Sequence, residues 1–151
     1  MYTRQEASQL RQAFWTSFGK YMSPILSADG EKINWINYKT GIKHIRFTME
    51  ADTKTAVIAI AIDHPDEATR SRYFQQLLQL QSFLHETLGE TWAWNEAANN
   101  EYGQAVSLIQ KELKPANIFD QTQWGAVISF LKQRIIALDE FWSMVKGGFE
   151  R

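Results

Sequence analysis

The sequence predicts an α+β domain in which a mainly antiparallel sheet of about five strands packs with three helices, in the order α-β-β-β-α-β-β-α. Three observations support this fold class. Residues 55–63 read TAVIAIAID, a short run that is apolar on both parities, as in the central strand of a sheet. Residues 45–50 alternate between apolar and polar side chains, which is typical of a strand with one buried face. Three longer segments repeat apolar residues at helical spacing.

The composition is that of an ordinary globular domain, expected to span residues 1–151. The chain has 44% hydrophobic residues, a formal net charge of −1 and no cysteine. A chain of this length buries a core large enough to fold without disulfides. The small net charge gives no general attraction to nucleic acid, which would need a local basic patch. Because we find no signal peptide and no apolar run of ~20 residues, we expect a cytoplasmic protein with no membrane partner.

The first helix is predicted over residues 4–22. Thr3 and Glu6 have the spacing of a capping box, in which each side chain bonds the other residue's backbone amide. Behind them, apolar residues recur every three or four positions, as on one face of a helix: Ala7, Leu10, Phe14, Phe18 and Tyr21. Ser23-Pro24 is expected to end the helix, since proline cannot continue it.

Three strands are predicted next, over residues 32–39, 42–51 and 55–63. Thr40-Gly41 and Asp52-Thr53 separate them. Because two-residue connections join neighbouring antiparallel strands, we expect a meander.

The two short turns predict a register for this meander. Phe47 then faces Ile58, and Ile45 faces both Ile60 and Ile36, on a face that lies against the core. A shift of one residue in either turn would exchange the two faces, because side chains alternate along a strand.

A long helix is predicted over residues 65–88. Pro65 suits its first position, where a missing N–H is harmless, and Gly89 suits its end. Two further strands are expected over residues 91–96 and 102–113.

The last helix is predicted to begin at Asp120, which has capping-box spacing to Gln123. Gly147-Gly148 ends it. Asp139 and Glu140 are expected on its solvent side.

The polar face of the meander is the candidate ligand or partner surface. We expect Trp35, Asn37, His44 and Arg46 to share this face, over a floor of small residues (Val57, Ala59 and Ala61). Arg46 offers a planar guanidinium for a carboxylate or phosphate, Trp35 a stacking plane, and His44 a response to pH near about 6.5. The same pattern also fits a solvated sheet face, or one covered by a helix with Arg46 stacked on Trp35.

The densest ionisable cluster follows the apolar strand. Asp63, His64 and Asp66 are residue types that ligate a divalent metal or act as acid and base. The same residue types also cap strand-to-helix junctions. The sequence has no HExxH, Walker, GxGxxG or GxSxG motif, and nothing assembles a nucleophile–base set. We therefore predict no catalytic residue and no cofactor.

Five segments in order resemble a bacterial family catalogued as domain of unknown function 4268: EASQLRQAFWTSFGKYM, INWINYKTGIK, IAIDHPDEATR, EYGQAVSLI and ALDEFW. Together they span essentially the full chain. The resemblance brings no agreed activity and no site residues. In longer relatives the domain follows a restriction-endonuclease-like module, so the resemblance implies an accessory role close to nucleic acid.

We expect a non-catalytic binding or accessory module, associated with nucleic-acid-processing systems, that binds a protein partner or itself. The alternative is a divergent metal-dependent nuclease-like hydrolase, whose candidate residues are Asp52, Asp63, His64 and Asp66. The predicted order of elements matches the start of the PD-(D/E)xK nuclease core, which needs a metal-binding acid and an acidic-x-Lys on its third strand. Asp52 fits the first requirement, but residues 55–63 contain no acidic-x-Lys, and Lys54 lies at the wrong end. A shared order of elements is a weak basis for assigning function.

Overall fold

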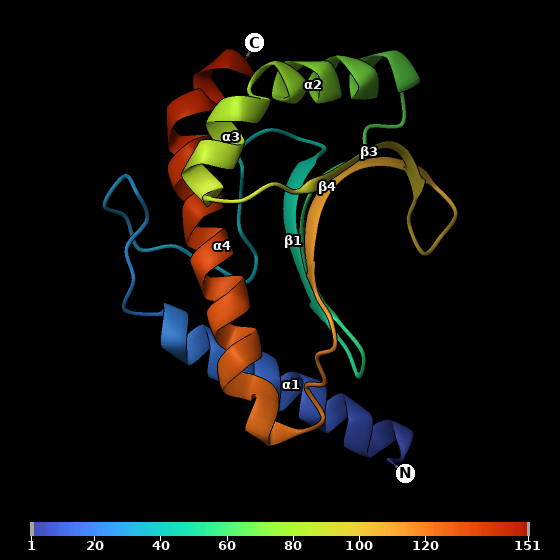
Figure 1. Cartoon of the computed structure of the whole chain (residues 1–151), viewed down its shortest axis with the longest axis vertical. Coiled ribbons are helices and arrows are strands. Elements are labelled where there is room, and N and C mark those ends of the chain that lie inside the picture. The colour runs from blue at the N-terminus through green and yellow to red at the C-terminus, as the bar shows by residue number, and fades with distance from the viewer. Residues whose placement is uncertain (1, 151) are drawn as a thin grey trace.

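The computed structural model describes residues 2–150, and it consists of one curved sheet backed by helices (Figure 1). Its elements are α1 (Arg4–Met22), β1 (Ile45–Ala51), β2 (Ala56–Ile62), α2 (Glu67–Gln79), α3 (Gln81–Leu88), β3 (Ala93–Asn99), β4 (Ala105–Leu113) and α4 (Trp124–Val145). The 3-10 turns Gln121–Gln123 and Lys146–Gly148 flank α4. The α+β class is confirmed. The described residues form four α-helices and four strands, so the predicted three helices and five strands are wrong in number.

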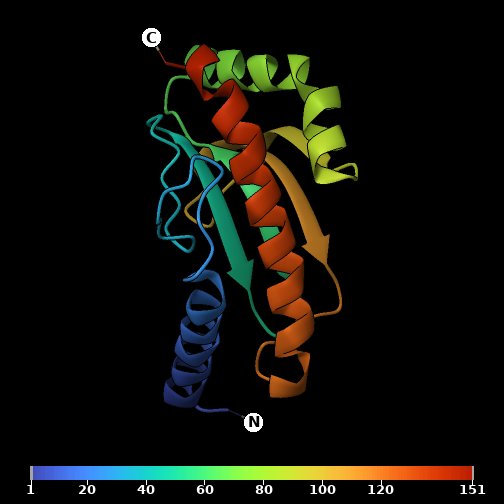
Figure 2. The same ribbon diagram turned by 90° about the vertical axis from the view of Figure 1, so that its left-hand side faces the viewer.

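The sheet is antiparallel throughout, with the order β1-β2-β4-β3. β2 pairs on both sides, which confirms the central position predicted for residues 55–63. The sheet bows, and α4 lies along its convex side, while α1 crosses below the lower end of the sheet (Figure 1). Figure 2 looks onto that side, where α4 crosses in front of the sheet.

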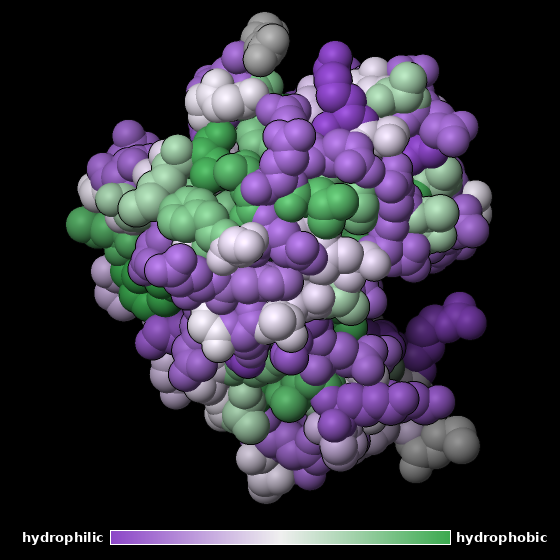
Figure 3. Space-filling model, turned by 45° about the horizontal axis from the view of Figure 1, so that its top comes forward, coloured by the Kyte–Doolittle hydropathy of each residue, from purple (hydrophilic) through white to green (hydrophobic). Residues whose placement is uncertain are grey.

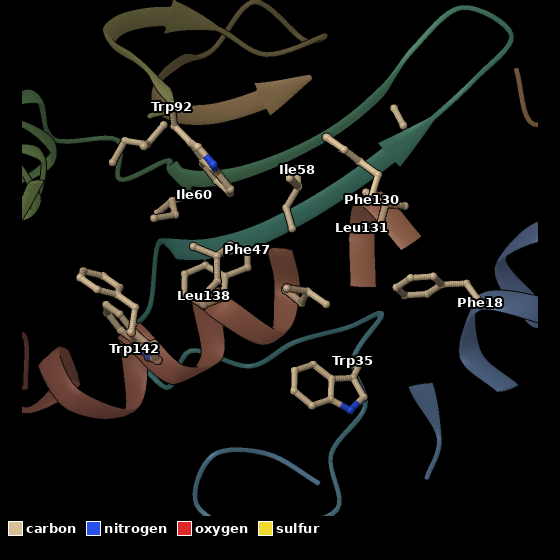
Figure 4. Close-up of a cluster of buried hydrophobic side chains, with 14 of the residues drawn as sticks. Phe18, Trp35, Phe47, Ile58, Ile60, Trp92, Phe130, Leu131, Leu138 and Trp142 are labelled. Atoms are coloured by element: carbon tan, nitrogen blue, oxygen red, sulfur yellow. The ribbon is translucent and has the colours of Figure 1, made fainter. Parts of the chain in front are cut away.

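The core lies between the convex face of the sheet and α4. Ile58, Ile60 and Ile62 of β2 are at most 1% exposed. They meet the apolar face of α4, whose Leu131, Ile135 and Leu138 are fully buried (Figure 4). Full burial of such a side chain contributes about 1.5–3 kcal/mol. This face therefore holds α4 against the sheet.

The predicted register of β1 and β2 is wrong by two residues. Phe47 pairs with Ile60, and Ile45 pairs with Ile62. The cause is a four-residue loop, residues 52–55, in place of the expected two-residue turn. Two residues are one full period of a strand, so the predicted assignment of side chains to the core face survives.

Asp52 closes this loop. Its carboxylate accepts the N–H groups of Lys54 (2.7 Å) and Thr55 (2.8 Å). The Thr55 and Lys54 amides hold the pKa of the Asp52 carboxyl below its ordinary value. Asp52 is therefore a turn residue, as is common for aspartate.

The strand predicted over residues 32–39 does not form. These residues belong to the connection between α1 and β1. Asn34 accepts the N–H groups of Ile36 and Asn37 (both 3.1 Å), which turns the chain instead of extending it. The apolar residues in this segment are explained by burial: Trp35 is 3% exposed and donates to the Ile25 carbonyl (3.0 Å).

The same connection covers one side of α4, so the expectation that Asp139 faces solvent is wrong. Asp139 is only 5% exposed. Its carboxylate accepts the Tyr38 hydroxyl (2.6 Å) and the Ala28 N–H (2.7 Å). Close by, the Trp142 indole donates to the Thr40 carbonyl (2.7 Å). These bonds fasten the connection to α4.

The stability of the protein is expected to fall at alkaline pH because of Tyr38. Burial and the Asp139 carboxylate raise the pKa of the Tyr38 phenol far above its ordinary value. A group whose pKa is higher in the folded state contributes its full stabilisation at pH values below its unfolded pKa, which is about 10 for tyrosine. Above that pH the free energy of unfolding falls, by at most ~1.4 kcal/mol per pH unit. Urea unfolding between pH 9 and 11 should show this slope, and Tyr38→Phe should reduce it. Tyr102→Phe, at an 80% exposed position, is the control. An unchanged slope in Tyr38→Phe would contradict the assignment.

The helix predicted over residues 65–88 is divided at Leu80, whose backbone (φ −98°, ψ 10°) separates α2 from α3. Gly89 ends α3 in the left-handed conformation, as predicted. The strands predicted over residues 91–96 and 102–113 are observed as β3 and β4 with shifted starts.

Of the two predicted capping boxes, one forms as expected and the other does not. The Thr3–Glu6 capping box is present at α1. Asp120 accepts the Thr122 N–H (3.0 Å) instead of the Gln123 N–H, so it caps the 3-10 turn that leads into α4.

Candidate functional site

The concave face of the sheet is the candidate site, because α4 lies on the other side of the sheet and α2 lies along its upper end (Figure 1). Side chains stand on this face in three rows that cross β1, β2 and β4. The rows are Arg46–Ala61–Leu108, Thr48–Ala59–Gln110 and Glu50–Val57–Glu112. The face therefore has small residues along its middle strand and longer, mostly polar residues on either side.

These rows form a hollow of about 320 Å³, which we call the concave groove. One wall is made by Arg46, Thr48 and Glu50. The opposite wall is the loop of the β3–β4 hairpin, residues 99–102. In Figure 3 the right-hand outline of the molecule is indented below the lobe that carries this hairpin.

The curvature of the sheet has a local cause on β3. The pairing of β3 with β4 is interrupted between Asn95 and Ala98. Such a bulge bends the strand and increases its twist. Alanines on β2 also leave space for the walls to approach, and Ala59 and Ala61 are only 3% and 6% exposed although no helix lies over them. The bulge and the small floor together produce a groove rather than a flat face.

Asp63 organises one end of the groove. One carboxylate oxygen lies 3.0 Å from His44 Nδ1, and the other lies 3.1 Å from Arg46 Nε. Two side chains from the start of β1 are thereby fixed to the residue that follows β2. The Arg46 side chain remains 64% exposed, so the guanidinium keeps donors that face solvent.

His44 has an unusual backbone conformation at this end of the groove. Its φ is +72°, in the left-handed region that non-glycine residues seldom occupy. Its carbonyl accepts the Asp63 N–H (3.0 Å), which extends the β1–β2 ladder by one pair. The His44 and His64 rings meet edge to face, 4.7 Å apart. The ladder bond and the Asp63 carboxylate hold the strained residue in place.

The charge of the groove is acidic. Of the described residues that line it, Glu50, Asp63 and Glu101 carry carboxylates, and Arg46 carries the one guanidinium. Its floor is apolar, with Val57, Val106 and Leu108. A phosphate backbone would meet more repulsion than attraction here.

The structure brings together two of the four residues predicted for the ligand face. Arg46 and His44 meet at Asp63. The placement expected for Trp35 is wrong, because Trp35 lies in the core near Phe18 and Leu131 (Figure 4). Asn37 is exposed on the α1–β1 connection and lines a different cavity, of about 340 Å³, beside Tyr38 and Asp139. Both placements were wrong because the predicted strand 32–39 does not exist.

The four residues of the metal alternative do not gather. Asp52 and Asp63 lie at opposite ends of β2. His64 Nδ1 accepts the Asp66 N–H (3.0 Å). Asp66 is the N-cap of α2 and accepts both the N–H (3.0 Å) and the hydroxyl (2.6 Å) of Thr69. These bonds hold the pKa of the Asp66 carboxyl below its ordinary value. Among residues 2–150 no group of three or more His, Cys, Asp or Glu residues is placed to hold a metal ion.

Sequence reasoning missed the part of the groove that comes from β4 and from the hairpin loop. The alternation in β1 predicted which of its side chains form the polar wall, and the alanines of β2 predicted the floor. Leu108 and Gln110 join them only because β4 pairs with β2, a contact between segments about 50 residues apart in sequence. No local pattern specifies that neighbour.

The fold and the groove define an α+β domain whose curved antiparallel sheet is helix-backed on one face and open on the other. The chain belongs to the family described as Domain of unknown function (DUF4268), whose model matches residues 10–146. The predicted resemblance is thus confirmed. Comparisons with curated proteins and with solved structures give no significant match. Within residues 2–150, no helix combines the length and the apolar character that crossing a membrane requires.

Proposed function

We propose that the chain is a non-catalytic binding module that holds a basic polypeptide segment of a protein partner in the concave groove. The observation that carries this proposal is a sheet face that is open, hollowed and acidic at its rim. An open and hollowed sheet face that no helix covers is a surface on which a partner can bind. The accessory role in nucleic-acid-processing systems, implied by the family resemblance, is then exerted through that protein partner.

The chemistry of the groove selects the class of occupant. Its apolar floor suits aliphatic side chains or the methylene stems of lysine and arginine, whose charged ends reach outward. Glu50 and Glu101 stand on opposite walls, where they attract those charged ends. Arg46, held by Asp63 through Nε, offers its remaining N–H groups to acceptors of the bound segment.

A charge-reversal experiment tests this function. The probe is the peptide acetyl-VKVKVKV-amide, and the comparison probes are acetyl-VEVEVEV-amide and single-stranded oligothymidylate. The lysine peptide should bind at least about tenfold more tightly than either comparison probe. Glu50→Lys should weaken it by a similar factor, because the repulsion replaces an attraction.

The matched control is Glu86→Lys, which makes the same change of net charge at an exposed position on α3. Fluorescence anisotropy gives the affinity, and the melting temperature shows that each variant is folded. Equal binding of the lysine and glutamate peptides, or no binding of either, would refute the proposed occupant. Tighter binding of the oligonucleotide would favour a nucleic-acid surface instead.

The metal-dependent hydrolase remains the alternative, and calorimetric titration with Mg²⁺, Mn²⁺ or Zn²⁺ separates the two functions. Tight stoichiometric binding that disappears in Asp63→Ala would favour the hydrolase over the binding module.

A further inference from the structure

The outer edge of β1 lies next to the concave groove and has no strand beside it in the described part of the chain. β1 is the first strand in the order β1-β2-β4-β3, so one of its edges is unpaired. The sequence predicted a strand over residues 32–39 at this position, and those residues form a loop instead. No strand from the described residues therefore pairs with this edge.

The hydrogen bonds that flank β1 show which of its main-chain groups point to this edge. At one end the Asp63 N–H donates to the His44 carbonyl, and at the other the Asp52 N–H donates to the Thr55 carbonyl (both 3.0 Å). Hydrogen-bonded pairs alternate along an antiparallel ladder. The even-numbered residues of β1 therefore bond to β2, and the odd-numbered residues point their N–H and C=O groups outward.

The first of these outward residues is satisfied within the chain. The Ile45 N–H donates to the Ile42 carbonyl (3.2 Å), and the Ile45 carbonyl accepts the Thr40 hydroxyl (2.6 Å). No described residue outside β1 and β2 makes a hydrogen bond to the main chain of the other three outward residues, Phe47, Met49 and Ala51. The unpaired stretch is thus residues 47–51.

The other edge of the sheet differs in a way that makes it a poorer template. β3 is interrupted by its bulge, and the Glu96 carbonyl accepts the Ser107 hydroxyl (2.7 Å). β1 pairs with its neighbour without interruption over its whole length, whereas β3 does not. Of the two edges, β1 is the one suited to accept a strand.

We propose that the polypeptide partner docks as an additional antiparallel strand on residues 47–51 of β1, and this inference rests on the binding function proposed above. An extended segment presents N–H and C=O groups at the spacing of Phe47, Met49 and Ala51, as in other cases of strand addition. The main chain of the segment then lies beside β1, outside the floor of the groove, and its alternate side chains reach the groove from the concave side, beside Thr48 and Glu50. In this arrangement a basic side chain of the added strand lies directly across from Glu50, as an opposite-charge cross-strand pair.

N-methylation of the probe peptide tests main-chain pairing directly. In the antiparallel arrangement the valines of acetyl-VKVKVKV-amide pair with the outward residues of β1, and the lysines face the groove. N-methylation of the two central valines should weaken binding by about tenfold or more, because each methyl group removes a donor and blocks the edge. N-methylation of two lysines should weaken it less than about threefold. Equal effects of the two modifications would overturn strand addition, and a reversed pattern would overturn the antiparallel arrangement.

A substitution in β1 provides the reciprocal test. Met49→Pro should abolish peptide binding without unfolding the protein, because the Met49 N–H is not part of the β1–β2 ladder. Met49→Ala, which removes only the side chain, should bind normally. If Met49→Pro unfolds the protein, amide hydrogen exchange by NMR decides instead: the exchange of the Phe47, Met49 and Ala51 amides should slow about tenfold or more when peptide is added to the unmodified protein. Unchanged exchange of these amides with peptide bound would overturn the inference.

The outcomes separate this inference from the proposed function. Binding that depends on Glu50 but is insensitive to N-methylation would leave the groove as the site and refute strand addition. A dimer in light scattering that Met49→Pro converts to a monomer would identify a second copy of the chain as the occupant of the edge and refute a basic partner segment.

Discussion

Asp139→Ala is expected to lower the free energy of unfolding by about 2–4 kcal/mol. The carboxylate receives the Tyr38 hydroxyl and the Ala28 N–H at 2.6 and 2.7 Å while being only 5% exposed. A hydrogen bond to a charged group contributes about 1.5–3 kcal/mol, and removal of the acceptor leaves both donors without a partner. Urea unfolding monitored by tryptophan fluorescence measures the loss.

The neighbouring residue supplies a matched control. Glu140 follows Asp139 on α4, about 100° further round the helix, and is exposed, so Glu140→Ala should change stability by less than about 0.5 kcal/mol. Asp139→Asn keeps an oxygen that accepts one of the two bonds, so its loss should fall between those of the two alanine variants. A loss below about 1 kcal/mol in Asp139→Ala would mean that the connection between α1 and β1 is not held to α4 by this carboxylate.

Ile60→Ala should lower the free energy of unfolding by about 2–5 kcal/mol, because it leaves a cavity at the centre of the core. Ile60 is 1% exposed, pairs with Phe47 on one side and Ile109 on the other, and faces α4. The control is Val57→Ala on the same strand, whose side chain lies on the concave face. It should cost less than half as much as Ile60→Ala, and it should leave the melting cooperative. A similar loss for the two variants would show that the concave face is as buried as the core.

Several features were determined by the sequence alone because their physical cause is local. The apolar run at residues 55–63 specified a central strand. β2 indeed pairs with a strand on each side, and its alanines are buried on the concave face although no helix covers that face. Thr3 and Glu6 specified the start of α1, because a capping box needs only residues three apart. Alternation in β1 assigned Arg46, Thr48 and Glu50 to one face, and that assignment holds even though the register is displaced by two residues.

The candidate site was only partly predictable for a related reason. The polar wall on β1 and the alanine floor on β2 follow from the period of two residues. The partners of Arg46 were not predictable, because Asp63 comes within 3.1 Å of it only when the four-residue loop sets the register. The sequence also suggested metal ligands at Asp63, His64 and Asp66. In the structure Asp63 forms an ion pair and Asp66 caps a helix.

The tertiary structure decided those features in which contacts between distant segments outweighed the local sequence pattern. Residues 32–39 have the composition of a strand, yet burial of Trp35 in the core and the Tyr38–Asp139 bond stabilise them as a loop against α4. The sequence predicted Asp139 to be a surface residue. Its side of α4 becomes buried only when a segment about 100 residues away packs over it. The physical reason is that burial and hydrogen bonding depend on which segments meet in space, and the pairings of loop with α4 and of β4 with β2 leave no signature in either segment by itself.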